Sequence, residues 1–224
     1  MDKHLSNMEE NDVKQEEGNT APKPYETEER EIQTLNELDL SSTYSYASYI
    51  RWKFEERVEL IKGKVFLMGA PATKHQVCIG IVFGELYQFL KGKPCKAFVS
   101  PFDVRFPGKS LMDQDVFTVL QPDICVVCDD RKIDAKGCIS APDIVVEVLS
   151  PGNNRKDLNS KFKVYEESGV REYLVIDPGR RSLLKYVLND NGVFVARKHD
   201  KVAGFFTSDV LPGFCLNIEE LFGG

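Results

Sequence analysis

The segment that most constrains the fold is the short run IVVEVL at residues 144–149. Successive side chains of a β-strand point to opposite faces of the sheet, so a strand that is apolar at every position is covered on both sides. Glu147 is the one exception in this run. A buried charge is costly unless another group pairs with it. The run therefore predicts a central strand, packed on both faces, that carries one carboxylate into the interior.

Asp123 has a similar setting in another strand-like run. It follows Pro122 and precedes the apolar residues 124–127. Two carboxylates on neighbouring buried strands repel each other unless a cation lies between them. The pattern therefore indicates a cation between Asp123 and Glu147.

A helix predicted at about 154–168 supplies a third charged residue. Its residues Leu158, Lys161, Phe162 and Tyr165 have the spacing i, i+3, i+4, i+7, which defines a stripe facing the core. Lys161 is the one charged member of that stripe. Its aliphatic stem would pack while its ammonium reaches the carboxylates and a substrate.

The same three residues allow a purely structural interpretation. Asp123 could cap a turn after Pro122, and Glu147 could form a buried salt bridge with Lys161 that holds the helix to the sheet. Composition and spacing alone do not separate this interpretation from catalysis.

Two further ionisable residues are weaker candidates. Glu59 interrupts the apolar run VELI and could complete a metal site, although a glutamate on an edge strand that faces water is the simpler interpretation. His75 stands near the start of a long helix, where it could face the same cleft or be solvated in the first turn.

The rest of the chain predicts a single mixed α/β or α+β domain behind an acidic tail. Residues 1–36 are polar and nearly free of large apolar side chains, so we expect a disordered tail followed by a folded domain at 37–224. The expected elements are a short capped helix from about Ser41 to Lys53, a hairpin at 58–68, a helix at 73–90, strands at 95–106, 116–127, 142–150 and 172–177, a hairpin at 182–196 and a helical turn at 218–222.

The net charge of −6 is unevenly distributed along the chain. The first 40 residues hold twelve acidic and four basic side chains, which leaves 23 acidic and 25 basic ones in residues 41–224. A domain with a charge of +2 can accept a polyanionic substrate, but tight duplex binding through phosphates usually needs a more basic surface. Weak or selective binding is therefore expected.

The six cysteines suggest reduced thiols that fill the core of a cytoplasmic protein. Cys125 and Cys128 form a CxxC pair, but residues three apart on a strand point to opposite faces, so one zinc ion could not easily bind both. No stretch approaches the roughly 18 consecutive apolar residues of a membrane span, and the N-terminus has no apolar core of a signal peptide.

Several strings in the sequence resemble one known family. QPDICVV, APDIVVEVLSP and GVREYLVIDP, with Lys161 between the last two, closely resemble a family described as putative restriction endonucleases, within the PD-(D/E)XK nuclease superfamily. The likeness extends from ERVELIKGKVFLM through APATKHQ and FDVRF to LPGF, which covers nearly the whole folded part. It implies a restriction-endonuclease-like core with a central mixed β-sheet flanked by helices.

The resemblance also implies roles for individual residues. In that superfamily an aspartate and a glutamate on successive strands bind a divalent metal, and a lysine two residues after the glutamate helps to activate water. It thus implies Mg²⁺, replaceable by Mn²⁺, on Asp123, Glu147 and the carbonyl of Val148. Leu149 stands where the lysine is expected, so the lysine's role passes to Lys161 on the following helix.

The function expected from these residues is metal-dependent hydrolysis of DNA phosphodiester bonds, with DNA and a second copy of the chain as partners. Two other functions stay open. One is a catalytically silent module that binds nucleic acid or joins an assembly, and the other is a metal-dependent hydrolase of small phosphate compounds. The sequence contains no GxxxxGK[ST], GxSxG or HExxH motif.

Overall fold

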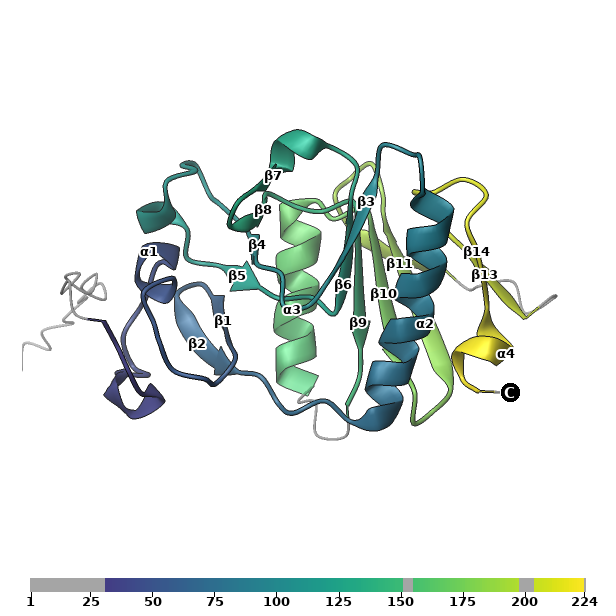
Figure 1. Cartoon of the computed structure of the whole chain (residues 1–224). Helices are drawn as coiled ribbons and strands as arrows, with labels where there is room; N and C mark the ends of the chain where they lie inside the picture. Colours follow the sequence, from purple (N-terminus) through teal and green to yellow (C-terminus); the bar gives the residue numbers. More distant parts are fainter. Residues whose placement is uncertain (1–30, 151–154, 198–203, 224) are drawn as a thin grey trace, which may run out of the picture.

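The computed structural model of the chain describes residues 31–150, 155–197 and 204–223 (Figure 1). Most of the predicted acidic tail therefore lies outside the described residues. Its last part does not, because Leu35–Glu37 form a short 3-10 helix, η1, and Ile32 and Leu35 pack against a core cluster that includes Leu38. The expected boundary at residue 37 is thus wrong by a few residues, since two apolar side chains suffice to attach this stretch.

The larger part of the structure is a mixed six-stranded sheet with the order β12-β11-β10-β9-β6-β3. Strands β9 and β10 are parallel and are connected by the helix α3, whereas all other neighbours are antiparallel. The bounds are β3 Lys96–Val99, β6 Ile124–Val127, β9 Ile144–Val148, α3 Arg155–Ser168, β10 Glu172–Asp177, β11 Ser182–Leu188 and β12 Phe194–Arg197. The predicted hairpin at 182–196 is confirmed as β11 and β12.

The two long helices cover opposite faces of this sheet (Figure 1). Helix α2, Thr73–Leu90, places apolar residues such as Val82 and Leu86 in one cluster with Val146 of β9. Tyr165 of α3 belongs to a second cluster with Val145. Strand β9 is therefore buried on both faces, as its sequence predicts. No helix within the described ranges is both long and apolar enough to cross a bilayer.

A second six-stranded sheet lies on the α3 side, with the order β2-β1-β5-β4-β8-β7. Its strands are β1 Val58–Ile61, β2 Lys64–Leu67, β4 Val104–Arg105, β5 Val119–Leu120, β7 Ile133–Asp134 and β8 Gly137–Ile139. The predicted hairpin β1–β2 turns at Lys62 and Gly63, which both have positive φ. A Cβ atom at Gly63 would lie 2.2 Å from Cγ2 of Thr43, so the turn requires glycine.

Two expected strands are each divided between the two sheets. The run at 95–106 separates into β3 and β4 around Pro101, and the run at 116–127 separates into β5 and β6 around Pro122. A proline cannot donate a ladder hydrogen bond, so it marks the place where the chain leaves one sheet. Asp123 follows Pro122 directly and therefore lies where the chain passes between the sheets.

The ends of the described chain differ from the prediction in detail. The helix expected to reach Lys53 is limited to α1, Tyr46–Tyr49. The small hairpin of β13, Phe205–Thr207, and β14, Cys215–Asn217, was not predicted, whereas the final turn is confirmed as α4, Ile218–Leu221. Of two further 3-10 helices, η2 (Asp113–Asp115) connects β4 to β5 within the second sheet, and η3 (Asp130–Lys132) lies between β6 of the first sheet and β7 of the second.

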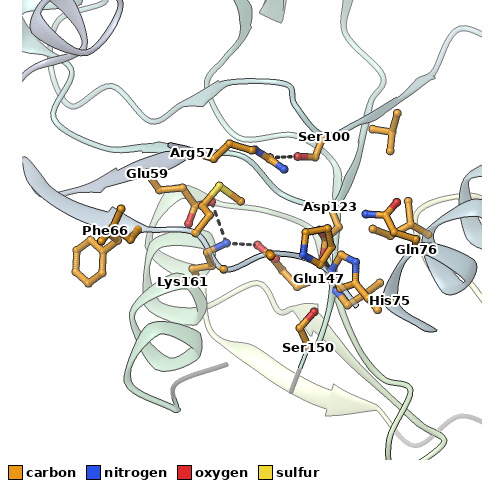
Figure 2. Close-up of a pocket in the computed structure, with 18 of the residues that line it drawn as sticks. Arg57, Glu59, Phe66, His75, Gln76, Ser100, Asp123, Glu147, Ser150 and Lys161 are labelled. Carbon is orange, nitrogen blue, oxygen red and sulfur yellow. Dashed lines mark hydrogen bonds and ion pairs between the residues drawn. The ribbon is translucent and has the colours of Figure 1, made fainter. Parts of the chain in front are cut away.

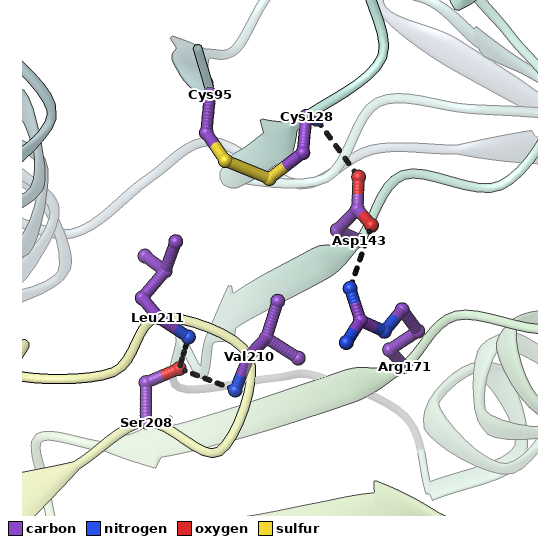
Figure 3. The surroundings of a disulfide bond; sticks show 7 residues. All are labelled: Cys95, Cys128, Asp143, Arg171, Ser208, Val210 and Leu211. Carbon is purple, nitrogen blue, oxygen red and sulfur yellow. Dashed lines mark hydrogen bonds and ion pairs between the residues drawn. A yellow bond between two sulfur atoms is a disulfide. The ribbon is translucent and has the colours of Figure 1, made fainter. Parts of the chain in front are cut away.

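The expectation that all cysteines are reduced is wrong for one pair. Cys95 and Cys128 form a disulfide bond (Figure 3). Strands β3 and β6 are antiparallel with Lys96 opposite Val127, so the next pair outward places Cys95 opposite Cys128. The two cysteines are 33 positions apart, so the sequence alone does not reveal this proximity. The free thiols are Cys78, Cys125, Cys138 and Cys215.

The geometric argument about the CxxC pair is confirmed. Cys125 belongs to the cluster on the α3 side of the sheet, whereas Cys128 packs against the cluster on the α2 side. The backbone N–H of Cys128 donates to Asp143 at 2.8 Å, and Asp143 also contacts Arg171 (Figure 3). This end of β6 is therefore fixed covalently and by hydrogen bonds.

Candidate active site

A pocket of about 440 Å³ opens where the two sheets and the two long helices meet. The β1–β2 hairpin, the start of α2, the start of β6, the end of β9 and α3 each contribute residues to its wall (Figure 2). All five side chains selected from the sequence, together with Val148, line this one pocket: Glu59, His75, Asp123, Glu147 and Lys161. The structure thus brings together residues that are far apart in the sequence, since Glu59 and Lys161 are separated by 102 positions.

Lys161 stands between two carboxylates. Its ammonium is 2.9 Å from Oε1 of Glu59 and 2.9 Å from Oε1 of Glu147, and its side chain is only 12% exposed. Burial by itself lowers the pKa of a lysine, but the negative charges of Glu147 and Glu59 raise the pKa of Lys161 above its ordinary value. Lys161 is therefore a fixed cation, and the buried ion pair considered in the structural interpretation is present.

Glu147 is held by two donors on the same oxygen. Its Oε1 accepts hydrogen bonds from Lys161 and, at 2.7 Å, from the hydroxyl of Tyr165. Burial raises the pKa of Glu147 to about 7, and the charges of Asp123 and Glu59 act in the same direction, whereas Lys161 and Tyr165 oppose the shift. Glu147 therefore changes its charge near neutral pH.

Asp123 is attached to the strand that bears Glu147. Its Oδ2 accepts a hydrogen bond of 2.7 Å from the backbone N–H of Val148, so the carboxylate binds β9 and does not cap a turn after Pro122. Nε2 of His75 lies 3.2 Å from the same oxygen. Among the described residues, no ion pair links Asp123 to Lys161. Asp123 is thus outside the lysine network, although it lines the same pocket.

Glu59 and His75 differ from the simpler interpretations of the sequence. Glu59 does not face water, because β1 lies inside its sheet and the residue is 4% exposed. Its Oε1 also accepts a hydrogen bond of 2.8 Å from the backbone N–H of Gln121. His75 is buried and faces the cleft, and its Nδ1 has no hydrogen-bond partner within the described part of the chain.

Three contributing residues were missed by the sequence reasoning. Tyr165 was identified only as a core residue of the helical stripe, although its hydroxyl binds Glu147. Arg57 and Ser100 also line the pocket, directly before β1 and directly after β3, and neither is a charged residue inside an apolar run. The one available signal was the helical register, since Tyr165 follows Lys161 by one turn and so faces the same neighbours.

The oxygen atoms that line the pocket are ligands of the kind that hard cations prefer. Carboxylate and carbonyl oxygens suit Mg²⁺, which commonly takes one or two carboxylates and keeps several water molecules. Across residues 31–150, 155–197 and 204–223, no three His, Cys, Asp or Glu side chains are grouped as ligands of one ion. Asp123 and Glu147 with a backbone carbonyl could hold Mg²⁺, whereas the four-ligand shell of a structural zinc ion has no counterpart there.

Comparisons with known proteins bear on the fold and the family of the chain. A crystal structure described as "a putative nuclease belonging to DUF820 from Anabaena variabilis ATCC 29413" superposes on 80% of this chain and 97% of its own, with a TM-score of 0.63 and 20% identity. The predicted restriction-endonuclease-like fold, with mixed sheets flanked by helices, is thereby confirmed. An uncharacterized protein of Synechocystis sp. (strain ATCC 27184 / PCC 6803 / Kazusa) is 28% identical over 148 residues, which cover 64% of this chain and 74% of the relative.

The sequence profile of one family covers most of the described structure. Residues 46–219 match the Uma2 family, whose description is "Putative restriction endonuclease". The matched range begins at α1, ends in α4 and contains every residue of the pocket. The chain belongs to the Uma2 family, as the motifs around Asp123 and Glu147 suggest.

Proposed function

We propose that this protein is a Mg²⁺-dependent endonuclease that hydrolyses phosphodiester bonds of DNA. The observation that carries the proposal is the arrangement of Asp123, Glu147 and Lys161 in one pocket, with Lys161 2.9 Å from Glu147. The family description and the name of the Anabaena structure support a nuclease. DNA as the substrate and Mg²⁺, or Mn²⁺ in its place, as the cofactor are part of the proposal.

Each residue has a defined task in this proposal. Asp123, Glu147 and the carbonyl of Val148 would hold the metal, which lowers the pKa of bound water and neutralises charge on the scissile phosphate. Lys161 remains protonated beside two carboxylates, so it orients the attacking water and stabilises negative charge and does not act as a base. Tyr165 and Lys161 both donate to Oε1 of Glu147 and fix the orientation of the carboxylate that would hold the metal.

Glu59 and His75 act through their neighbours. Glu59 holds the Lys161 ammonium at 2.9 Å and is itself anchored by the backbone of Gln121. His75 lies beside Asp123 and sets the direction of its Oδ2. Both are therefore positioning residues. A second copy of the chain would supply the second cut that cleavage of both strands of a duplex requires.

A cleavage assay tests the proposal directly. Purified protein is incubated with supercoiled plasmid and with single-stranded DNA in Mg²⁺, in Mn²⁺ and in EDTA. We expect cleavage with either metal and none in EDTA. Asp123→Asn should abolish it, whereas Asp190→Asn, which changes an exposed aspartate in the β11–β12 turn, should not. Cleavage that survives in Asp123→Asn would come from another nuclease and would refute the assignment.

One observation favours the catalytically silent module as the second candidate. Both charged partners of Lys161 lie at hydrogen-bond distance, so the ion pairs could serve only to hold α3 against the two sheets. A wild-type protein that binds DNA but leaves it intact with every metal would select this alternative.

A further inference from the structure

Arg57 is a second cation in the pocket, and its surroundings differ from those of Lys161. The residue precedes β1 and its guanidinium points across the pocket toward Ser100 (Figure 2). Nη2 donates to Oγ of Ser100 and, at 2.7 Å, to Oε1 of Gln121, and Nε lies 3.3 Å from the same Gln121 oxygen. Both partners are neutral.

The charge of Arg57 is therefore not compensated inside the described structure. No carboxylate of the described ranges lies within ion-pair distance of its guanidinium, whereas Lys161 is placed between Glu59 and Glu147. An arginine keeps its charge at every physiological pH. Arg57 is thus the pocket cation that remains able to bind an anion.

The guanidinium is also fixed relative to the acids. The backbone N–H of Ser100 donates to the carbonyl of Asp123 at 3.0 Å, and the backbone N–H of Gln121 donates to Glu59 at 2.8 Å. The two partners of Arg57 are thus bonded to two of the acidic residues of the site. A donor that is held in place before the ligand arrives loses little entropy on binding.

The Gln121 side chain is itself held by hydrogen bonds to two further residues. Its Nε2 donates to the hydroxyl of Tyr49 at 3.0 Å and to Oδ1 of Asp103 at 2.9 Å. Both of its amide atoms are therefore engaged, and the oxygen is directed to Arg57. Because Nε and Nη2 are occupied by Gln121 and Ser100, Nη1 is the part of the guanidinium that has no partner among the described residues, and its N–H groups can donate to a phosphate oxygen.

We propose that Arg57 binds a phosphate of the nucleic-acid backbone in this pocket. The ligand class is a phosphodiester anion, and the proposal rests on the proposed function because it takes DNA as the polymer. The guanidinium would neutralise one backbone phosphate while the acids and Lys161 address the bond to be cut. Arg57 would thereby set which phosphate lies at the site.

Binding measured without metal tests this proposal separately from cleavage. Fluorescence anisotropy in EDTA at low salt compares wild type, Arg57→Gln, Arg57→Lys and Arg51→Gln on one labelled oligonucleotide, single-stranded and duplex. Arg51 is exposed and does not line the pocket, so it is the matched control for the loss of one charge. We expect roughly 10-fold weaker binding for Arg57→Gln. The slope of log affinity against log salt concentration should also become shallower by about 1, which corresponds to the loss of one phosphate contact. Arg57→Lys should lie between the two, and Arg51→Gln should bind like the wild type.

A purely structural role of Arg57 would give a different pattern. If the residue only held Ser100 and Gln121, Arg57→Gln would weaken Mn²⁺ binding and lower the melting temperature without changing the salt dependence of DNA binding. That result would overturn the phosphate site, as would equal affinity of wild type and Arg57→Gln. Failure of the nuclease proposal has another signature, since a wild type that never cuts DNA can still show Arg57-dependent binding in EDTA.

Discussion

Two buried glutamates on neighbouring parallel strands have opposite surroundings. Glu147 lies near the end of β9 and Glu172 begins β10, and Glu172 is 0% exposed. Burial raises the pKa of both carboxyls. Oε2 of Glu172 accepts hydrogen bonds from Ser208 Oγ and from the backbone N–H groups of Asp209 and Val210, which fixes the loop before β14. Glu147 instead faces a pocket.

The lysines beside the two acids also differ. Lys185, near Glu172, donates to Asp209 at 2.6 Å and to the carbonyl of Thr207, and Asp209 is 47% exposed at its side chain. Lys161 is placed between two buried carboxylates. Burial and a raised pKa therefore do not identify a functional acid. The distinguishing feature is what surrounds the acid: Oε2 of Glu172 accepts three hydrogen bonds from one loop, whereas Glu147 lies near other acids and lines a pocket.

The largest difference is expected in cleavage. Glu147→Gln removes a proposed metal ligand and should lower the rate of plasmid cleavage by about 1,000-fold or more. Glu172→Gln should retain the rate within about twofold per folded molecule, because the residue does not reach the pocket. The measurement is initial rate with Mg²⁺ at a temperature where both variants are folded. Equal losses in both variants would remove the proposed distinction.

The lysines should differ in stability. Lys161→Met leaves two buried carboxylates without their cation, so the free energy of unfolding at pH 8 should fall by about 3 to 5 kcal/mol. The loss should shrink at acidic pH, because protonated carboxyls no longer need the cation. Lys185→Met breaks a pair with a half-exposed partner and should cost only about 1 kcal/mol. Urea unfolding at both pH values provides the comparison.

A bound metal should change the stability contribution of Glu147 and leave that of Glu172 unchanged. A carboxyl with a raised pKa keeps its proton in the native state, so the wild type without metal should lose stability as pH rises from about 4.5 to about 7. Mn²⁺ should relieve this loss for Glu147 and raise the melting temperature. Asp123→Asn removes both the repulsion and a ligand, so it should be at least as stable without metal and gain nothing from Mn²⁺. A strongly destabilised Asp123→Asn and a wild type indifferent to metal would contradict the metal site.

The smallest expected effect is the pH dependence of metal affinity. Glu147 must lose its proton to bind a cation. The Kd for Mn²⁺ should therefore decrease about 10-fold for each unit by which the pH rises toward about 7, and it should be constant above that pH. Glu172→Gln should keep this dependence, and Glu147→Gln should lose it together with most of the affinity. Isothermal titration calorimetry measures the Kd of each variant between about pH 5.5 and about pH 8. This range extends about 1 unit or more to each side of the expected transition.

The elements with strong periodicity were predictable because each is decided by its own sequence. The apolar run around Glu147 gave the central strand, and the stripe of α3 placed Lys161 toward the sheet. Glu59 was misjudged because its burial depends on β5, which pairs with β1 from far along the chain. The Cys95–Cys128 bond depends in the same way on the register of β3 and β6.

The burial of Glu172 is a second feature that the sequence does not predict. Nothing in the run EYLVID separates its glutamate from a solvated strand end, and its burial follows from the loop at 208–210 that folds over it. Contacts between segments remote in sequence thus decide the burial of Glu59 and Glu172 and the pairing of Cys95 with Cys128. Contacts within one strand or helix decide the burial of Glu147 and the orientation of Lys161.

The passage of the chain between the sheets at Pro122 has a consequence for cooperativity. Glu59 belongs to one sheet and Glu147 to the other, and Asp123 lies on the segment that links β5 to β6. Neither sheet alone contains the complete set of groups, so the pocket exists only while the two folding units are docked. A local opening that separates the sheets would dismantle the site while leaving each sheet hydrogen-bonded. A ligand bound across this boundary would convert two units with separate opening equilibria into one that opens as a whole.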